Sequence, residues 1–127
     1  MRAVDTNVLV RLVTRDDPSQ AADADSFIAN GAWVSNLVLA ETTWVLNAMY
    51  GLGASALAQA IEMLLNHRQL ALEDPETISA ALKRFRHHPK LGFSDCLILE
   101  TARKAGHVPL GTLDKRLAKL EGAQRIT

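Results

Sequence analysis

Four acidic residues, Asp5, Glu41, Asp95 and Asp114, differ from the other carboxylates of the chain, which lie in polar or capping surroundings. Three of the four stand where a helix is predicted to begin, and each of these three fits an N-cap role. Glu41 does not, because the residues one helical turn before and after it are apolar: Leu37, Val38, Trp44 and Val45. We therefore expect Glu41 to point toward the core or a cleft, where a carboxylate needs a basic partner or a metal ion. No basic residue lies within a turn of it.

A cluster of the four carboxylates would be unstable without cations. Two carboxylates about 5 Å apart repel each other by roughly 3 kcal/mol at an effective dielectric constant near 20. The cluster would persist only with bound cations or with raised pKa values. Oxygen-only ligands favour the hard ions Mg²⁺ and Mn²⁺ over zinc. Such a pocket suits two-metal chemistry on phosphodiesters, in which one ion activates water and the other stabilises the leaving oxygen.

The elements that would position these side chains follow from apolar periodicity and from helix start and stop signals. Strands are predicted at Arg2–Val4, Ala32–Ser35, Leu70–Leu72, His107–Thr112 and Arg125–Ile126. Helices are predicted after Asp5, from Asp17-Pro18 to Gly31, over Leu37–Tyr50, around Leu57–Leu65, from Asp74-Pro75 to near Pro89, from Ser94 or Asp95 to Gly106, and over Asp114–Leu120. Gln20 is placed to complete a capping box with Asp17.

Strands separated by helices predict right-handed crossovers and a mainly parallel sheet covered on both faces. In such α/β sheets, sites form outside the carboxyl ends of the strands. Asp5 directly follows the first predicted strand, and Asp114 lies just past the fourth. The pattern therefore predicts an α/β fold that places acidic residues at one edge of its sheet.

The composition limits the class of protein. A length of 127 residues with 48% hydrophobic residues predicts one globular domain, residues 1–127. Lys plus Arg and Asp plus Glu number 14 each, so net charge neither favours nor excludes a nucleic-acid partner. We expect no membrane segment, because no apolar run approaches about 18 residues. The single cysteine, Cys96, excludes an internal disulfide and fits a reducing cytoplasm, and its apolar neighbours predict a buried thiol rather than a nucleophile.

Four sequence blocks resemble those of a known family. "VDTNVLVRL", "LAETTWVL" around Glu41, "FSDCLILETA" around Asp95 and "GTLDKRLAKL" around Asp114 are similar to the signature blocks of PIN-domain ribonucleases. More narrowly, they resemble the VapC-type toxins of bacterial type II toxin–antitoxin pairs. The resemblance covers essentially the whole chain in the family's order. It implies a PIN-like three-layer sandwich with a central, mainly parallel sheet of four to five short strands flanked by helices.

The resemblance also implies a site and partners. Asp5, Glu41, Asp95 and Asp114 would surround Mg²⁺ or Mn²⁺, with Asp5 and Asp95 as direct ligands and the other two binding directly or through water. Asn7 and Thr112 would be supporting polar groups. The implied reaction is endonucleolytic cleavage of RNA that leaves a 3′-hydroxyl and a 5′-phosphate. A homodimer and a small antitoxin are expected, with promoter DNA bound only through the antitoxin. Cys96 and Leu113 depart from the family's usual residues and affect only the expected pocket shape.

Other functions remain open at the level of sequence. A housekeeping RNA-processing PIN nuclease and a PIN fold that only binds partners share the same fold. A haloacid-dehalogenase-type phosphatase needs a second acid two residues after the first, where this chain has Asn7, and it needs a later lysine motif that is missing. A response-regulator receiver needs paired acids after its first strand, and these are also missing.

Basic and aromatic residues supply secondary hypotheses. The stretch "KRFRHHPK", Lys83–Lys90, fits either phosphate contacts or solvated charge on a helix. The preferred phosphate contacts are Arg11, Arg15, Lys115 and Arg116, which lie nearer the acidic blocks in sequence. Trp44 is expected to belong to the core.

Overall fold

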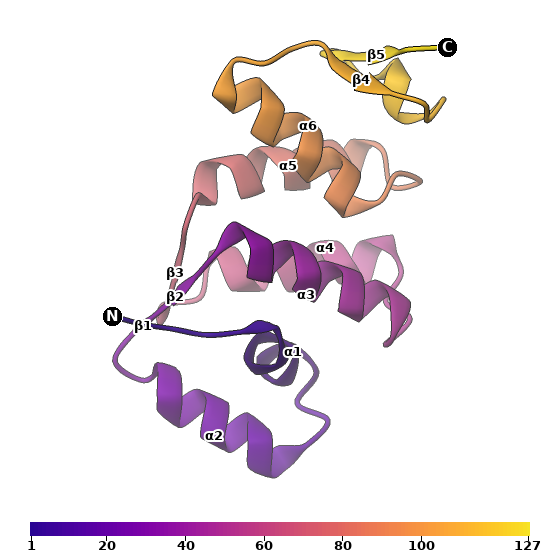
Figure 1. Ribbon diagram of the computed structural model, residues 1–127. Helices are drawn as coiled ribbons and strands as arrows, with labels where there is room; N and C mark the ends of the chain where they lie inside the picture. The colour runs from indigo at the N-terminus through magenta and orange to yellow at the C-terminus, as the bar shows by residue number, and fades with distance from the viewer. The chain divides into compact units, whose positions relative to one another are not determined.

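The structure, a computed structural model, describes all residues from Met1 to Thr127. The chain divides into two compact units, Met1–Pro75 and Glu76–Thr127, and each contains helices and parallel strands (Figure 1). The predicted α/β fold is confirmed. No helix is both long enough and apolar enough to cross a lipid bilayer.

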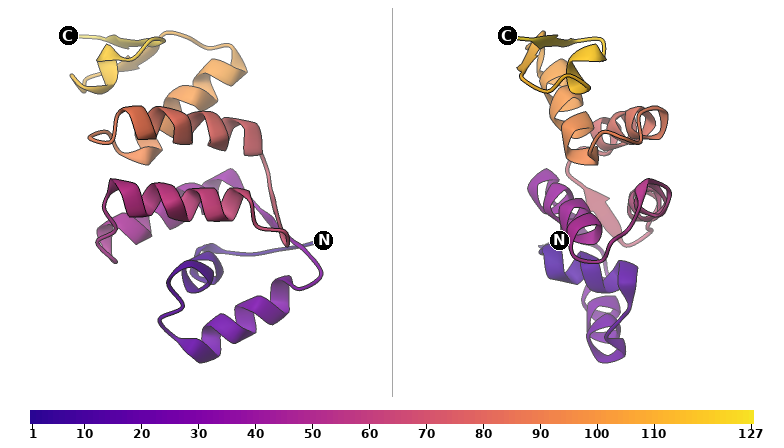
Figure 2. Two further views of the ribbon diagram at one scale, coloured as in Figure 1. Left: turned by 180° about the vertical axis from the view of Figure 1, so that it is seen from behind. Right: turned by 90° about the vertical axis from the view of Figure 1, so that its right-hand side faces the viewer.

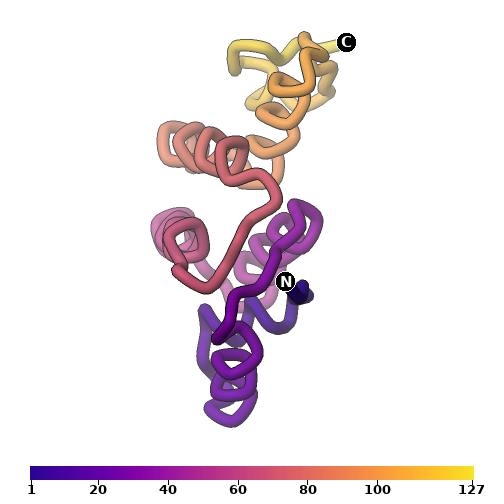
Figure 3. The backbone as a smooth tube through the Cα atoms, turned by 90° about the vertical axis from the view of Figure 1, so that its left-hand side faces the viewer, coloured from indigo at the N-terminus to yellow at the C-terminus, as the bar shows by residue number.

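The first unit alternates strands and helices along the chain. Its elements are β1 (Arg2–Ala3), α1 (Thr6–Thr14), α2 (Pro18–Ile28), β2 (Ala32–Val34), α3 (Asn36–Ala48), α4 (Ala54–Leu65) and β3 (Leu70–Leu72). The strands form a parallel sheet in the order β1-β2-β3, with Arg2 opposite Ala32 and Ala32 opposite Leu70. Figure 3 follows the backbone through the helical connections that return each strand parallel to the previous one. The carboxyl ends of all three strands therefore lie at one edge of this sheet.

Short polar residues begin three helices of the first unit, and the sequence predicts two of these caps, Asp5 and Asp17. Asp5 caps α1, Asp17 caps α2 and Ser35 caps α3, and each side chain accepts a hydrogen bond from a backbone N–H three residues later. Only half of the predicted capping box forms at Asp17. The Gln20 backbone N–H donates to the Asp17 side chain, but the Gln20 side-chain oxygen accepts from Arg11 Nε at 2.6 Å and not from the backbone of Asp17. These caps fix where the chain turns from strand to helix. They therefore also fix where the polar residues of the carboxyl edge stand.

The core of the first unit is made of aliphatic side chains from its helices and from β2. The most deeply buried ones are Leu9, Val34, Leu39, Leu46, Ile61 and Leu64. Helix α1 packs against both α2 and α3. The burial of this apolar surface, at roughly 25 cal/mol per Å², is the main stabilising contribution to this unit.

The second unit contains two helices and a small sheet. Its elements are α5 (Pro75–His87), α6 (Phe93–Ala105), β4 (Leu110–Thr112), a 3₁₀ helix (Leu117–Lys119) and β5 (Ala123–Arg125). Phe85 of α5 and Phe93 of α6 meet edge to face, with ring centroids 5.9 Å apart. Strands β4 and β5 are parallel, and with the 3₁₀ helix they lie on one side of α6 (Figure 2).

Three predictions that involve the second unit differ from the structure. The five strands are divided between two sheets, three in the first unit and two in the second. The helix predicted over Asp114–Leu120 is wrong, because a turn at Asp114 leads only into the 3₁₀ helix. Helix α6 begins earlier than predicted, with Gly92 at the N-cap position and neither Ser94 nor Asp95 as the cap.

Candidate active site

Asp5 lies at the carboxyl edge of the first sheet, two residues after β1 ends. Its Oδ1 accepts a hydrogen bond from the backbone N–H of Val8 at 3.2 Å, which is the N-cap contact of α1. The side chain is exposed, and its second carboxylate oxygen makes no hydrogen bond. Asp5 is thus a helix cap that still has an oxygen available to a ligand.

Glu41 lies in the middle of α3, and the hydroxyl of Thr6 donates a hydrogen bond to its Oε1. Thr6 itself is buried, whereas Glu41 is exposed. Of the two settings predicted for Glu41, the core and a cleft, the core is therefore wrong. The contact brings the Glu41 carboxylate beside the residue that follows Asp5, at the start of α1. Sequence reasoning missed Thr6, although its place between Asp5 and Asn7 was a usable signal.

The burial prediction failed because α3 carries apolar residues on two faces. Its core-facing residues are Leu39, Thr42, Thr43 and Leu46. The two threonines enter the core without an unpaired hydroxyl, because Thr42 donates to the carbonyl of Val38 and Thr43 to that of Ala40, each at 2.7 Å. The opposite face exposes Leu37 and Trp44, at 79% and 62% of their full surface, so the predicted core role of Trp44 is also wrong.

Asp95 and Asp114 belong to the second unit and influence each other electrostatically. Asp95 is half-buried in the first turn of α6, and Asp114 is exposed after β4. Burial, and after it the negative charge of Asp114, raises the pKa of Asp95. The backbone amide of Gly92 acts in the opposite direction. This pair of carboxylates therefore has the like-charge repulsion that a bound cation would relieve.

A tight turn holds Asp114 in place. Its Oδ1 accepts hydrogen bonds from the backbone N–H groups of Arg116 at 2.7 Å and Leu117 at 2.9 Å. These two amides, with Leu117 the stronger, lower the pKa of Asp114, so Asp114 is already ionised when Asp95 titrates. The Thr112 hydroxyl accepts from the Asp114 N–H at 3.0 Å, which is a contact that orients this carboxylate. Asn7 is exposed, and its side chain makes no hydrogen bond.

The four predicted acids thus form two pairs, one in each unit, and their assembly into one cluster remains a prediction. Neither unit alone gathers three or more His, Cys, Asp or Glu side chains into a metal-holding group. The donor chemistry nevertheless fits a hard divalent cation. Asp5, Glu41 and Asp114 each use only one carboxylate oxygen in hydrogen bonds within the protein, which leaves the other oxygen for an ion.

Glu100 is the acidic residue that is actually buried, at 8% exposure. Its Oε1 accepts from Arg84 Nε at 2.6 Å, and its Oε2 lies 3.5 Å from Arg103 Nε. Arg103 Nε is buried and makes no hydrogen bond, although its Nη2 donates to the carbonyl of Glu121. Glu100 is therefore a structural ion-pair residue, whereas its polar sequence surroundings had predicted ordinary surface.

Two of the four preferred phosphate contacts are already paired within the first unit. Arg15 forms an ion pair with Asp25 at 2.6 Å. Arg11 Nη1 donates to Asp16 Oδ1 at 3.2 Å and to Tyr50 Oη at 2.9 Å, which ties α1 to the residues after α3. These two arginines stabilise the unit and are poor candidates for binding phosphate.

A buried thiol next to Asp95 is excluded as a nucleophile. Cys96 is fully buried, and burial, followed by the charge of Asp95, raises its pKa to about 11. Because only the thiolate attacks, this residue is inert near neutral pH.

The structure is thus an α/β protein in which acidic residues follow the ends of parallel strands. A profile of the PIN domain family matches residues 2–123, and the chain belongs to this family. PIN domains are generally nucleases, and PIN nucleases generally use divalent metal ions. No curated protein and no solved structure gives a significant match to the chain.

Proposed function

We propose that this protein is a Mg²⁺- or Mn²⁺-dependent endoribonuclease that acts in the cytoplasm as the toxin of a toxin–antitoxin pair. The family match supports nuclease chemistry, and the order of the four acidic blocks supports the narrower activity. The observation that carries the proposal is the pairing of acids, with Glu41 held beside Asp5 through Thr6 and Asp95 influenced by Asp114.

Each side chain has a distinct role in the proposed reaction. Asp5 and Asp95 would be the direct ligands, while Glu41 and Asp114 would bind the ion directly or through water. The ion would activate the attacking water and stabilise the leaving oxygen. Thr6 orients Glu41, and Thr112 with the turn amides orients Asp114, so these two carboxylates are positioned before any ion arrives.

Cleavage of RNA by the purified protein tests the nuclease proposal. We expect cleavage of total RNA in Mg²⁺ or Mn²⁺ and none in EDTA. Asp5→Asn keeps the volume and the capping oxygen but removes the charge, so cleavage should fall by about 10²-fold or more. Asp23→Asn, which neutralises an exposed acid on α2, is the matched control and should remain active. Full activity in EDTA would exclude the metal-dependent reaction.

A housekeeping PIN nuclease is the second candidate, and growth after expression distinguishes the two. The toxin proposal predicts that expression of the protein alone arrests bacterial growth and that Asp5→Asn relieves the arrest. Expression of the active wild-type enzyme without any effect on growth would favour the housekeeping role.

The exposed face of α3 supports the proposed antitoxin partner. Leu37 and Trp44 lie four residues before and three residues after Glu41, so a carboxylate stands within an exposed apolar stripe. An amphipathic antitoxin segment with one inserted basic residue fits this stripe. The proposed assembly is a homodimer that carries antitoxin and reaches promoter DNA only through the antitoxin.

Purification from the native host tests the partner. We expect a small chain to co-purify with the wild-type protein and to be lost with Trp44→Asp. Recovery of the protein alone, without any small chain, would contradict the antitoxin proposal.

A further inference from the structure

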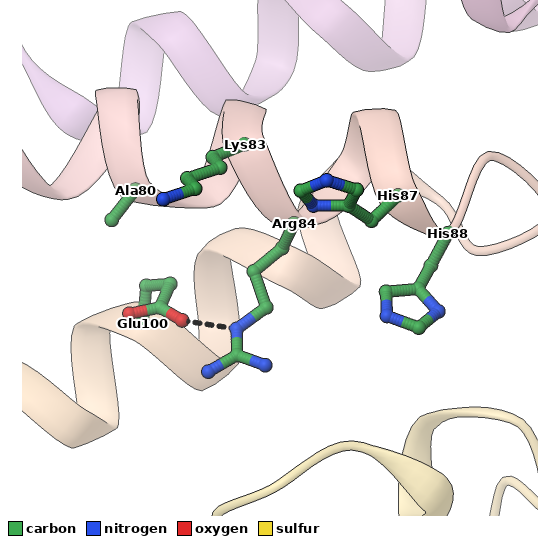
Figure 4. A pocket seen from close by; sticks show the side chains of 6 residues that line it. All are labelled: Ala80, Lys83, Arg84, His87, His88 and Glu100. Carbon is green, nitrogen blue, oxygen red and sulfur yellow. Dashed lines mark hydrogen bonds and ion pairs between the residues drawn. The ribbon is translucent and has the colours of Figure 1, made fainter.

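A pocket in the second unit is lined mainly by basic side chains. It has a volume of about 310 Å³ and is lined by Ala80, Lys83, Arg84, His87, His88 and Glu100 (Figure 4). All but Glu100 come from α5 or the residue after it. We propose that this pocket binds a backbone phosphate of the single-stranded RNA substrate, an inference that rests on the proposed nuclease function.

The helical spacing explains how the basic side chains gather. Lys83 and His87 are four residues apart, as are Arg84 and His88, so two neighbouring rows of nitrogen donors run along one side of α5. The opposite side of α5 buries Ile78, Ala81, Leu82 and Phe85. Cations near a helix C-terminus are favoured by the helix dipole, which accounts for their place on α5. The helix dipole does not account for the concave surface between these side chains.

Arg84 is positioned for a ligand by Glu100. The Glu100 carboxylate accepts from Nε of Arg84 at 2.6 Å, and the two terminal nitrogens point away from this contact, as Figure 4 shows. Neither terminal nitrogen makes a hydrogen bond within the protein. A guanidinium that is held at Nε and keeps both terminal nitrogens free matches the oxygens of a phosphate. Because it is already held in place, it loses little side-chain entropy on binding.

The charges around the pocket are unbalanced. Glu100 is the only acidic side chain in the lining, and its other oxygen already faces Arg103 at 3.5 Å. Lys83 is exposed and makes no hydrogen bond or ion pair. Arg84 and Arg103 thus share the one carboxylate and Lys83 has no acidic partner, in a chain whose overall charges cancel. A local positive excess in a concave site favours an anionic ligand.

The ligand class follows from the donors. The lining contains no Phe, Tyr or Trp, and both oxygens of its one carboxylate already face arginines. Lys83 and Arg84 are therefore expected to recognise the charge of the backbone and not the identity of the bases. The contact is therefore expected with the phosphodiester backbone and should be indifferent to sequence.

Binding of a labelled single-stranded RNA to the full-length protein in EDTA tests the proposal without cleavage. Each phosphate contact contributes a slope of about 0.7 in the dependence of log K on log salt concentration for single strands. Lys83→Gln should lower the slope by about 0.7 and weaken binding about fourfold near 0.15 M salt. Arg68→Gln is the charge-matched control, because Arg68 is exposed before β3 and makes no ion pair.

A second variant and a second nucleic acid sharpen the result. Ala80→Glu places a negative charge in the pocket and should weaken binding more than Lys83→Gln does. Single-stranded DNA of the same sequence should show the same losses, because the backbone charge is the same. A loss confined to RNA would overturn the phosphate assignment, as would a Lys83→Gln slope equal to that of Arg68→Gln.

Cleavage in Mg²⁺ separates this proposal from the proposed function. Lys83→Gln should raise KM while leaving kcat unchanged, since the pocket binds substrate uniformly in ground and transition states. If wild-type protein binds RNA with the expected slopes but does not cleave it, the nuclease proposal fails and the pocket stands. If it cleaves RNA and Lys83→Gln behaves like the control in both assays, the pocket proposal fails alone.

Discussion

Glu41 and Glu100 are both glutamates in the middle of a helix, yet the structure uses them in opposite ways. Glu41 has apolar neighbours in sequence and is exposed, whereas Glu100 is followed by "TARK" and is buried. Glu41 accepts a hydrogen bond from a neutral hydroxyl, and Glu100 interacts with two arginines. A glutamate is thus buried where cations from other turns or helices reach it, whatever its sequence neighbours are.

This difference also separates stability from chemistry. A buried carboxylate whose charge is balanced within the protein has no need of a metal ion. An exposed carboxylate held by a hydroxyl keeps its full negative charge and one oxygen for a ligand. Glu100 therefore belongs to the structure of the second unit, and Glu41 is available for the proposed reaction.

Replacement of Glu100 tests its structural role and should change stability more than any other substitution proposed below. Glu100→Gln removes the charge that balances Arg84 and Arg103 and should lower the free energy of unfolding by about 3 kcal/mol. The loss should be the same with and without Mg²⁺, and it is measured by denaturant unfolding. Glu121→Gln, which changes an exposed acid nearby, is the control. If Glu100→Gln is as stable as that control, the two arginines do not need the carboxylate.

The next effect concerns Glu41 and should fall on activity. Glu41→Gln keeps an oxygen that accepts from Thr6, so the free energy of unfolding should change by less than about 0.5 kcal/mol. RNA cleavage should fall by about 10²-fold, because the charge that holds the metal ion is lost. Unfolding in EDTA and a cleavage assay measure the two quantities. A variant that is much less stable but fully active where folded would place Glu41 with Glu100 as a structural residue.

The smallest effect tests the hydroxyl that holds Glu41. Thr6→Val keeps the shape of a buried side chain but cannot donate, which should cost about 1 kcal/mol. If the whole cost falls on the transition state, cleavage slows about fivefold. In the Glu41→Gln background the same change should have little further effect on cleavage. Equal slowing in both backgrounds would show that Thr6 acts independently of Glu41.

Helix starts of the first unit were predictable from sequence because their signals are local. Asp5, Asp17 and Ser35 each precede a helical pattern, and a cap needs only the next three residues. Helix starts of the second unit were harder to predict, because their local signals are absent or misleading. Gly92 caps α6 without any side-chain hydrogen bond, so Asp95 looked like the cap. The turn at Asp114 is also capped like a helix start, but only a 3₁₀ helix follows.

The environment of the candidate site was less predictable, because it depends on contacts between distant residues. The identity of the four acids follows from their sequence blocks, but the face of α3 that enters the core does not. Thr42 and Thr43 are buried only because their hydroxyls bond back to their own helix, and periodicity of apolar residues cannot register this. The Thr6 contact with Glu41 spans 35 residues and has no local signal for its partner.

Cys96 offers a way to time the opening of the second unit. It is the only thiol of the chain, it has no exposed surface, and its pKa of about 11 leaves almost no thiolate near neutral pH. A thiol reagent can therefore react only when α6 transiently leaves its packing, and the rate of labelling counts these openings. Because Cys96 adjoins Asp95, ions that bind there would slow the labelling. Metal occupancy would then be readable from the intact protein as a chemical rate, without RNA and without cleavage.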